Sequence, residues 1–219
     1  MNRHLLFDFD GTLVDSLGIG IKAFNAIGDR HGYPHIHAED LEMLMRKPIR
    51  DRFNHYGVPM VKFPSLVVEF YKEYKKSLKE LQFFEGIPEM LKNLNEEGYR
   101  ISVMSSNDPN IIKTYMKQHG IQLFHRIVGS SRLFGKDRMI RRYMRREKIN
   151  LDQILYVGDE LRDIEACKKV GVPIIWVSYG FDHEDLVKSV QPEFMAHSPQ
   201  DVSEIVLNGW GQKQVALEG

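Results

Sequence analysis

The sequence predicts an α/β fold in which a parallel sheet carries an inserted helical cap. Short apolar segments alternate with helical segments from about residue 88 onward, and a further apolar segment occupies residues 3–9. Between these regions, residues 16–81 have helical periodicity and no strand pattern of their own. Repeated strand–helix alternation is typical of a parallel sheet with right-handed crossovers. We therefore expect a Rossmann-like core formed by residues 1–15 and 82–219, with a helical cap at residues 16–81.

The first segments of the chain support both the opening strand and the cap. Residues 3–9 are mostly apolar, and the turn sequence Asp10–Thr12 ends them. In the expected cap, Pro64 and Ser65 form a helix start signal. Side chains then recur at helical spacing at Leu66, Phe70, Tyr71, Tyr74, Leu78 and Leu81. This pattern predicts a helix with an apolar and aromatic face.

The second part of the chain alternates strands and helices, with capping residues at the expected ends. Asp108 precedes Pro109 at the start of one helix and Gly120 stands at its end, which is typical of an N-cap and C′ pair. Gly98 and Gly171 end two further helices. The predicted strands span residues 99–104, 125–128, 154–157, 174–177 and 194–196. The predicted helices span residues 88–97, 109–120, 137–147, 161–170 and 199–208.

Composition and charge restrict the class of protein. The 219 residues include 30 Lys and Arg and 30 Asp and Glu, and this balance argues neither for nor against an acidic partner. The single cysteine, Cys167, excludes an intrachain disulfide and fits a reducing compartment. No apolar run approaches the roughly 18 residues needed to cross a bilayer. Asp8 and Asp10 interrupt the apolar start, so we expect no signal peptide and a soluble cytoplasmic protein.

Polar side chains follow three of the predicted strands at the point where each strand ends. Asp8 lies at the carboxyl end of the first strand and Asp10 just past it, Ser105 lies just past the second strand, and Asp159 lies just past the strand at residues 154–157. The carboxyl ends of parallel strands meet in one crevice, where ligands bind. Each residue alone could be a turn former or a helix cap. Together, with carboxylates at two separate strand ends, they predict an active site.

The two aspartates of the first strand end can divide the work of a nucleophile and a proton carrier. Asp8 can attack an electrophile while Asp10 gives and takes a proton. A carboxylate suits an attack on phosphorus when a metal neutralises the charge. Asp159 offers the metal a further oxygen ligand, and Asp163, one helical turn on, can support it. Such a carboxylate set fits Mg²⁺, which keeps waters and phosphate oxygens as its other ligands.

Several further residues fit a phosphoryl group at the same strand ends. Gly11 allows the backbone to approach a phosphate closely, and the amides after Asp8 can form an anion nest. Ser105 and the amide of Ser106 offer hydrogen-bond donors to phosphoryl oxygens. Lys136 would place a cation against those oxygens. The sequence therefore predicts phosphoryl transfer as the reaction.

These motifs resemble those of the haloacid-dehalogenase-like hydrolases, and of their phosphatases in particular. Phe7–Ser16 resembles the first signature of that family and Ile101–Ser105 resembles the second. Lys136 matches the third, and Gly158–Asp159 with Asp163 matches the fourth, in the same order and at similar spacing. The helical stretch between the first two signatures resembles the cap of the phosphoglycolate-phosphatase-like branch. The resemblance covers nearly the whole chain.

The resemblance implies a phosphatase that acts on a small phosphorylated metabolite. In that family Asp8 would be the nucleophile and Asp10 the general acid/base. Magnesium would be held by Asp8, the carbonyl group of Asp10, and Asp159. We expect neither nucleic acid nor a membrane as a partner, and the oligomeric state stays open.

This chain departs from the family pattern at three places. Asp137 follows Lys136 where proline is common, and Glu160 stands where a small hydroxyl residue is usual, next to the predicted metal site. In the cap, Arg46–Ile49 replaces a glycine-containing turn. We predict that three basic residues, two in this segment and one directly after it, bind an acidic substrate. The alternative is that they are ordinary surface charges. These residues are Arg46, Lys47 and Arg50.

Four alternatives remain open at this point. A phosphomutase of the same family would share every core residue. A dehalogenase would attack carbon and would need neither Asp10 nor a metal. A non-catalytic protein could keep the fold and bind a phosphorylated ligand. Finally, the basic residues between 138 and 148 could bind an acidic partner, although such a stripe is more often a solvated helix face.

Overall fold

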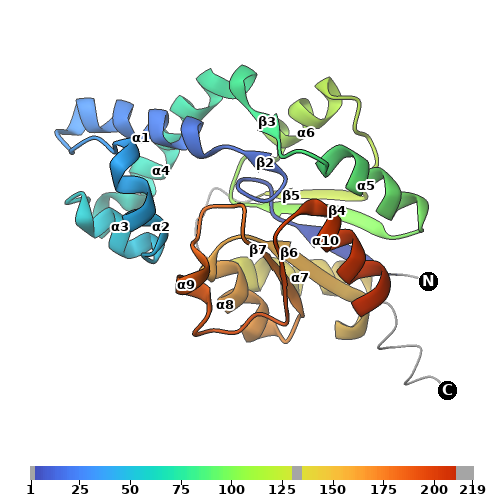
Figure 1. Cartoon of the computed structure of the whole chain (residues 1–219). Coiled ribbons are helices and arrows are strands. Elements are labelled where there is room, and N and C mark those ends of the chain that lie inside the picture. The colour runs from blue at the N-terminus through green and yellow to red at the C-terminus, as the bar shows by residue number, and fades with distance from the viewer. Residues whose placement is uncertain (1–2, 130–134, 211–219) are drawn as a thin grey trace.

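The core of the protein is a six-stranded parallel sheet (Figure 1). The structure, a computed structural model, describes residues 3–129 and 135–210. The strands stand in the order β5-β4-β1-β6-β7-β8, which confirms the predicted α/β fold class. Their bounds are β1 His4–Phe7, β4 Arg100–Ser105, β5 Arg126–Gly129, β6 Ile154–Gly158, β7 Ile174–Val177 and β8 Phe194–Ala196.

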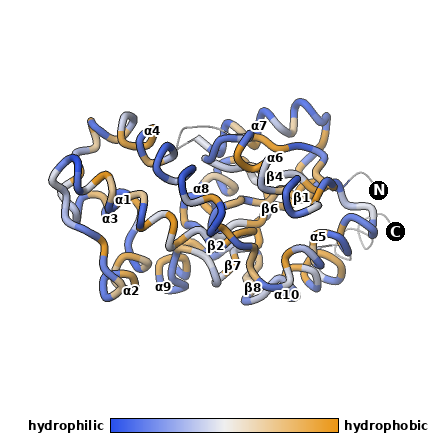
Figure 2. The backbone as a smooth tube through the Cα atoms, turned by 90° about the horizontal axis from the view of Figure 1, so that it is seen from above, coloured by the Kyte–Doolittle hydropathy of each residue, from blue (hydrophilic) through white to orange (hydrophobic). Residues whose placement is uncertain are grey.

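Helices cover both faces of the sheet because successive strand side chains point in opposite directions. Leu5 and Phe7 of β1 enter one hydrophobic core, and Leu6 between them enters the other. The first core is closed by α5 Ile87–Glu96, α6 Pro109–Gln118 and α10 Pro199–Glu204. The second is closed by α7 Lys136–Glu147 and α8 Leu161–Val170. Figure 2 shows the inner strands as largely hydrophobic, while the surrounding helices alternate hydrophobic and hydrophilic turns.

Two elements differ from the sequence prediction. The first strand was expected over residues 3–9, but β1 ends at Phe7 because the chain then turns, and Asp10 forms an isolated bridge with Val14. One helix was predicted over residues 199–208. In the structure α10 ends at Glu204 and a π-helical segment, Ile205–Trp210, continues it. A short helix, α9 Glu184–Val187, precedes β8. Within residues 3–129 and 135–210, no helix is both long and apolar enough to span a membrane.

Four α-helices form a separate layer beside the sheet (Figure 1). In the sequence they lie between two short strands. The strands are β2 Val14–Asp15 and β3 Gln82–Phe83, which pair antiparallel and place the outgoing and returning chain side by side. The helices are α1 Leu17–His31, α2 Leu41–Met45, α3 Ile49–His55 and α4 Phe63–Tyr74. They share a small core of their own that includes Phe24, Tyr56 and Leu66. We propose these helices, within residues 16–81, as the cap, and the β2–β3 pair supports that division.

The cap is seated on the core at two places. On one side, Arg46 pairs with Asp185 and Arg52 pairs with Asp182, while the amide of His183 donates to the carbonyl of Met45 at 2.9 Å. On the other side, the end of α4 approaches the strand ends of the sheet. There the Tyr74 hydroxyl donates to Asp10 Oδ1 at 2.6 Å, and the ammonium group of Lys75, just beyond α4, lies 3.2 Å from Asp108.

A buried polar network joins three elements at the opposite end of the sheet. His4 Nδ1 of β1 lies 2.8 Å from the hydroxyl of Tyr143 in α7. That hydroxyl lies 2.9 Å from the hydroxyl of Ser102 in β4. Burial, together with the nearby His125 and Arg100, lowers the pKa of His4 from 6.5 to about 4 against the opposing effect of Glu147. His4 is therefore neutral in the folded protein at neutral pH.

This network predicts a pH-dependent loss of stability. As the pH falls from 6.5 towards 4, the unfolded chain protonates His4 while the folded chain does not. The free energy of unfolding should therefore fall over that interval, by on the order of 3 kcal/mol. His4→Gln should remove this part of the pH dependence in urea denaturation, whereas His55→Gln, at an exposed cap position, should retain it. Equal pH dependence in both variants would contradict the assignment to His4.

Candidate active site

The strand order brings the predicted polar residues to one place. β1 lies between β4 and β6, so the chain crosses from one side of β1 to the other between β5 and β6. Asp8 follows β1, Ser105 ends β4 and Asp159 follows β6. These three strands are adjacent, and the site lies at their carboxyl ends, where the order of the sheet reverses. All three side chains are buried.

Lys136, the first residue of α7, holds two carboxylates at the centre of the site. Its ammonium group donates to Asp8 Oδ2 and to Asp163 Oδ1, and all three side chains are almost fully buried. The amide of Phe9 donates to the other Asp8 oxygen at 2.7 Å. Burial favours a neutral amine, but the two carboxylates outweigh it and raise the pKa of Lys136. The lysine is thus a fixed positive charge beside Asp8.

Asp159 lies in a space that two glycines leave open. A Cβ atom at Gly180 would lie 2.2 Å from Asp159 Cβ, and one at Gly11 would lie 2.3 Å from Asp159 Oδ2. Thr12 Oγ1 donates to Asp159 Oδ1 at 2.8 Å, and the amide of Phe181 donates to Oδ2 at 2.8 Å. Gly11 therefore has a role beyond the predicted one, because its missing side chain makes room for a site carboxylate.

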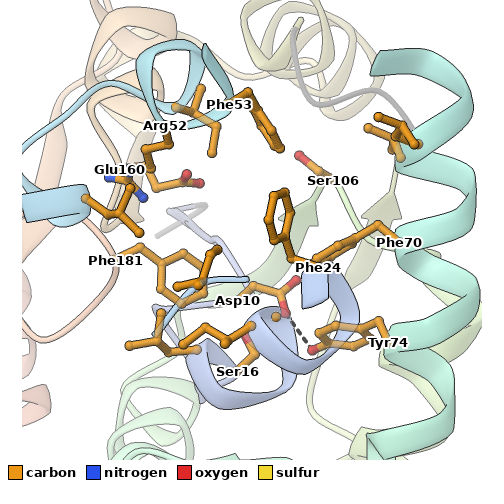
Figure 3. A pocket seen from close by; sticks show the side chains of 18 of the residues that line it. Asp10, Ser16, Phe24, Arg52, Phe53, Phe70, Tyr74, Ser106, Glu160 and Phe181 are labelled. Carbon is orange, nitrogen blue, oxygen red and sulfur yellow. Dashed lines mark hydrogen bonds between the residues drawn. The ribbon is translucent and has the colours of Figure 1, made fainter. Parts of the chain in front are cut away.

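Asp10 is held by side chains from both the cap and the core. Besides the Tyr74 hydroxyl, Asn107 Nδ2 donates to Asp10 Oδ2 at 3.2 Å. Burial raises the pKa of Asp10, and the hydrogen bonds from Tyr74, Ser16 and Asn107 oppose that rise without cancelling it. The protonated form is thus favoured relative to an ordinary aspartate. Figure 3 shows the Tyr74 contact as a dashed line beside Ser16.

One of the two predicted serines, Ser106, binds an arginine that the sequence analysis did not single out. Arg162 Nε donates to Glu160 Oε2 at 2.6 Å, and Arg162 Nη1 donates to the Ser106 hydroxyl at 3.2 Å. The amide of Asn107 donates to Ser105 Oγ at 2.9 Å. Glu160 is thus neutralised by Arg162. Arg162 lies within the segment Gly158–Asp163, which contains predicted site residues, and this position in the sequence could have identified it as a further site residue.

The charges of the site do not balance within the described residues 3–129 and 135–210. The buried carboxylates Asp8, Asp159, Glu160 and Asp163 face two cations, Lys136 and Arg162. Oxygens of three of them, Asp8, Glu160 and Asp163, lie within 4.8 Å of one another. Burial and mutual repulsion raise the pKa of Asp159 far above its ordinary range and raise that of Asp163 to about 6. An excess of oxygen donors with negative charge fits a hard divalent cation.

An apolar cavity opens onto the catalytic candidates. It has a volume of about 230 Å³, and its lining includes Asp8, Asp10, Ser105 and Ser106. The cap contributes the rings of Phe24, Phe53 and Phe70 to its lining; Figure 3 shows Phe24 and Phe70 near the Asp10 carboxylate and Phe53 on the opposite side of the space.

A second, polar groove of about 670 Å³ lies on the other side of Glu160 and Arg162. Its lining includes Lys136, Arg50 and Arg138 but neither Asp8 nor Asp10.

The structure does not bring the three predicted cap cations together at the cavity. Arg46 pairs with Glu42 and Asp185, and neither Arg46 nor Lys47 belongs to the described lining of either space. Arg50 lines only the polar groove. Their prediction rested on positive charge in a segment that departs from the family pattern, and the distant partner Asp185 was not visible in the sequence.

Comparisons with known proteins find relatives over most of the chain. The family model for haloacid dehalogenase-like hydrolases matches residues 5–177. A phosphoglycolate phosphatase of Synechococcus elongatus is 28% identical over 203 residues, which cover 92% of this chain and 96% of that protein. A 5'-nucleotidase of Pseudomonas aeruginosa is 26% identical over 86% of this chain and 88% of its own length. The solved structure of a haloacid dehalogenase-like hydrolase from Streptococcus pneumoniae has a TM-score of 0.76 at 27% identity, covering 92% and 96% of the two chains.

The contact between the cap and Asp10 gives a testable prediction. Tyr74→Phe removes one hydrogen bond to a catalytic candidate and should lower kcat for a phosphomonoester roughly tenfold to a hundredfold, as expected for a bond worth about 1.5–3 kcal/mol. Tyr33→Phe is the matched control, because Tyr33 lines the same cavity and its hydroxyl group has no hydrogen-bond partner among the described residues. Similar small effects in both variants would show that Tyr74 does not position Asp10.

Proposed function

Because the chain belongs to the haloacid dehalogenase-like hydrolase family, we propose that it hydrolyses small phosphomonoesters through a phosphorylated Asp8. One observation carries the proposal: Asp8 is buried against the Lys136 ammonium group, and it opens with Asp10 onto a single cavity. A carboxylate that is fixed by a lysine and faces a second carboxylic acid is suited to nucleophilic attack with proton transfer. The similarity to a protein named phosphoglycolate phosphatase supports the same reaction.

The reaction takes place in two steps. In the first, an Asp8 oxygen forms a bond to phosphorus, the ester P–O bond breaks, and the leaving oxygen receives the Asp10 proton. In the second, Asp10 takes a proton from water as the water oxygen attacks phosphorus, which releases phosphate and restores the Asp8 carboxylate. The raised pKa of Asp10 supports its protonated form for the first step. Lys136 stabilises the negative charge on Asp8 and on the phosphoryl oxygens.

Magnesium is the cofactor that we propose for this site. The donor set is made of carboxylate oxygens with surplus negative charge, which fits a hard cation better than a soft one. Asp8, the Asp10 carbonyl group and Asp159 would hold the ion, with Glu160 and Asp163 close by. When bound, the ion supplies positive charge that offsets the repulsion between a phosphate ester and the Asp8 carboxylate.

Ser105, Ser106 and the Gly11 backbone complete the proposed phosphoryl site. The buried hydroxyl groups of both serines border the same cavity as Asp8. These core residues bind only the phosphoryl group. Residues outside the core must therefore distinguish one alcohol portion from another. The two named relatives act on different alcohols by name, which supports a substrate choice made outside the core. The buried single cysteine supports a cytoplasmic location.

Replacement of the nucleophile tests the reaction. Asp8→Asn should reduce hydrolysis of p-nitrophenyl phosphate by roughly a thousandfold or more, because an amide cannot form the acyl phosphate. The fold should survive, since Asp163 keeps Lys136 paired. Asp152→Asn, an exposed change of the same type, is the control. Activity within tenfold of the parent in a folded Asp8→Asn sample would remove Asp8 from this role.

Removal of the metal tests the cofactor. Protein treated with a chelator should lose activity and regain it when Mg²⁺ is added. Mg²⁺ should also raise Tm, because an ion that binds only the folded state stabilises it and relieves the repulsion among the carboxylates. In Asp159→Asn both the rescue and the rise in Tm should need more Mg²⁺. Full activity in excess chelator would exclude the metal-dependent mechanism.

A further inference from the structure

We propose that the preferred substrates carry an apolar alcohol portion, aromatic or branched aliphatic, rather than a second anionic group. This inference rests on the proposed phosphatase function and concerns the part of the substrate that leaves with the ester oxygen. It reverses the preference that the sequence of the cap suggested through Arg46, Lys47 and Arg50.

The position of Asp10 determines which space the leaving group occupies. A general acid must lie within hydrogen-bond reach of the oxygen that it protonates. Asp10 lines the apolar cavity and is absent from the described lining of the polar groove. The alcohol portion of a bound ester therefore extends into the apolar cavity, while the groove lies on the Lys136 side of the site.

The walls of this cavity are made mainly by apolar side chains of the cap. Three of them are the phenyl rings of Phe24, Phe53 and Phe70; Figure 3 shows Phe24 and Phe70 near the Asp10 carboxylate and Phe53 across the cavity from it. All four cap helices contribute; their further apolar lining residues include Ile21, Leu44, Met45, Ile49, Leu66 and Val67. A cavity of about 150 Å³ with similar walls is large enough for benzene. The volume of about 230 Å³ thus has room for an aromatic ring and its link to the ester oxygen.

The two cations among the described residues of the cavity wall each have a carboxylate partner. Arg52 pairs with Asp182 and also donates to the Lys47 carbonyl at 2.8 Å. Arg162 pairs with Glu160. A carboxylate on the alcohol portion would lose its hydration among phenyl rings without gaining a new counterion there, which is unfavourable. An apolar group gains from the same burial.

Three esters that differ only in one substituent can measure this preference. Benzyl phosphate, ethyl phosphate and phosphoglycolate carry a phenyl, methyl or carboxylate group on the same methylene. With Mg²⁺, kcat/KM for benzyl phosphate should exceed that for ethyl phosphate by roughly tenfold and that for phosphoglycolate by roughly a hundredfold. A higher value for phosphoglycolate than for benzyl phosphate would overturn the inference while leaving the phosphatase function intact.

Two neighbouring valines of α4 provide a matched pair of variants. Val67 is half-buried and lines the cavity, whereas Val68 is 66% exposed and outside its lining. Val67→Lys should lower the ratio of benzyl phosphate to phosphoglycolate activity by roughly tenfold or more, because it adds an uncommitted cation to the wall. Val68→Lys should leave the ratio unchanged. If Val67→Lys does not fold, the nearly isosteric Val67→Thr should still lower the ratio, by less.

Ligand binding to the inactive Asp8→Asn variant separates the two proposals. Calorimetry with the non-hydrolysable phenethylphosphonate and phosphonopropionate should give tighter binding of the phenyl compound, by roughly tenfold or more. The apolar preference would be refuted if phosphonopropionate binds more tightly than the phenyl compound. It would also be refuted if Val67→Lys and Val68→Lys change the ratio of benzyl phosphate to phosphoglycolate activity equally. If the parent hydrolyses none of the three esters while phenethylphosphonate binds tightly, the phosphatase function is refuted. The assignment of the cavity to an apolar group then still stands.

Discussion

The burial of several carboxylates around one lysine is the constraint on which the rest of the structure depends. An isolated buried charge is costly, so Asp8 and Asp163 can both be ionised only while Lys136 stands between them. The three residues come from the end of β1, the start of α7 and the first turn of α8. Their meeting therefore requires the parallel sheet, its crossovers and the packing of both helices on one face. The apolar strands give rigidity to a site whose charges repel one another.

The core and the cap line the cavity with different kinds of side chain, and the proposed function accounts for this difference. The core end of the cavity presents carboxylates, hydroxyl groups and backbone amides, which suit a phosphoryl group and a cation. The cap presents rings and aliphatic side chains, which exclude water from the same space. Lower local polarity strengthens the interaction of Lys136 with the charges beside it. Tyr74 is an exception on the cap side, since its hydroxyl group binds Asp10 directly.

Local patterns predicted the fold well because strands and helix ends depend on nearby residues. The helix expected over residues 161–170 matches α8, and the apolar run at 154–157 lies in β6. Contacts between distant residues were not predictable in this way. Periodicity placed Tyr74 on the apolar face of a helix, but its bond to Asp10 depends on where the cap rests. Likewise, an arginine such as Arg46 looks the same in sequence whether it binds a substrate or Asp185, 139 residues away. The roles proposed for Asp8 and Asp159 came from motif resemblance and strand ends together.

The contacts that seat the cap are suited to repeated opening. The Arg46–Asp185 pair has both side chains at least 40% exposed, and exposed pairs of this kind contribute only about 0–1 kcal/mol. Arg52 and Asp182 are more deeply buried, so their separation must be compensated by water or by other partners. Tyr74 adds one hydrogen bond at the opposite side. In the proposed reaction these few contacts would hold the cap over phosphorylated Asp8, and they would have to separate for the alcohol to leave and for water to enter. Opening of the cap would then couple product release to the same residue, Tyr74, that orients the acid for the next turnover.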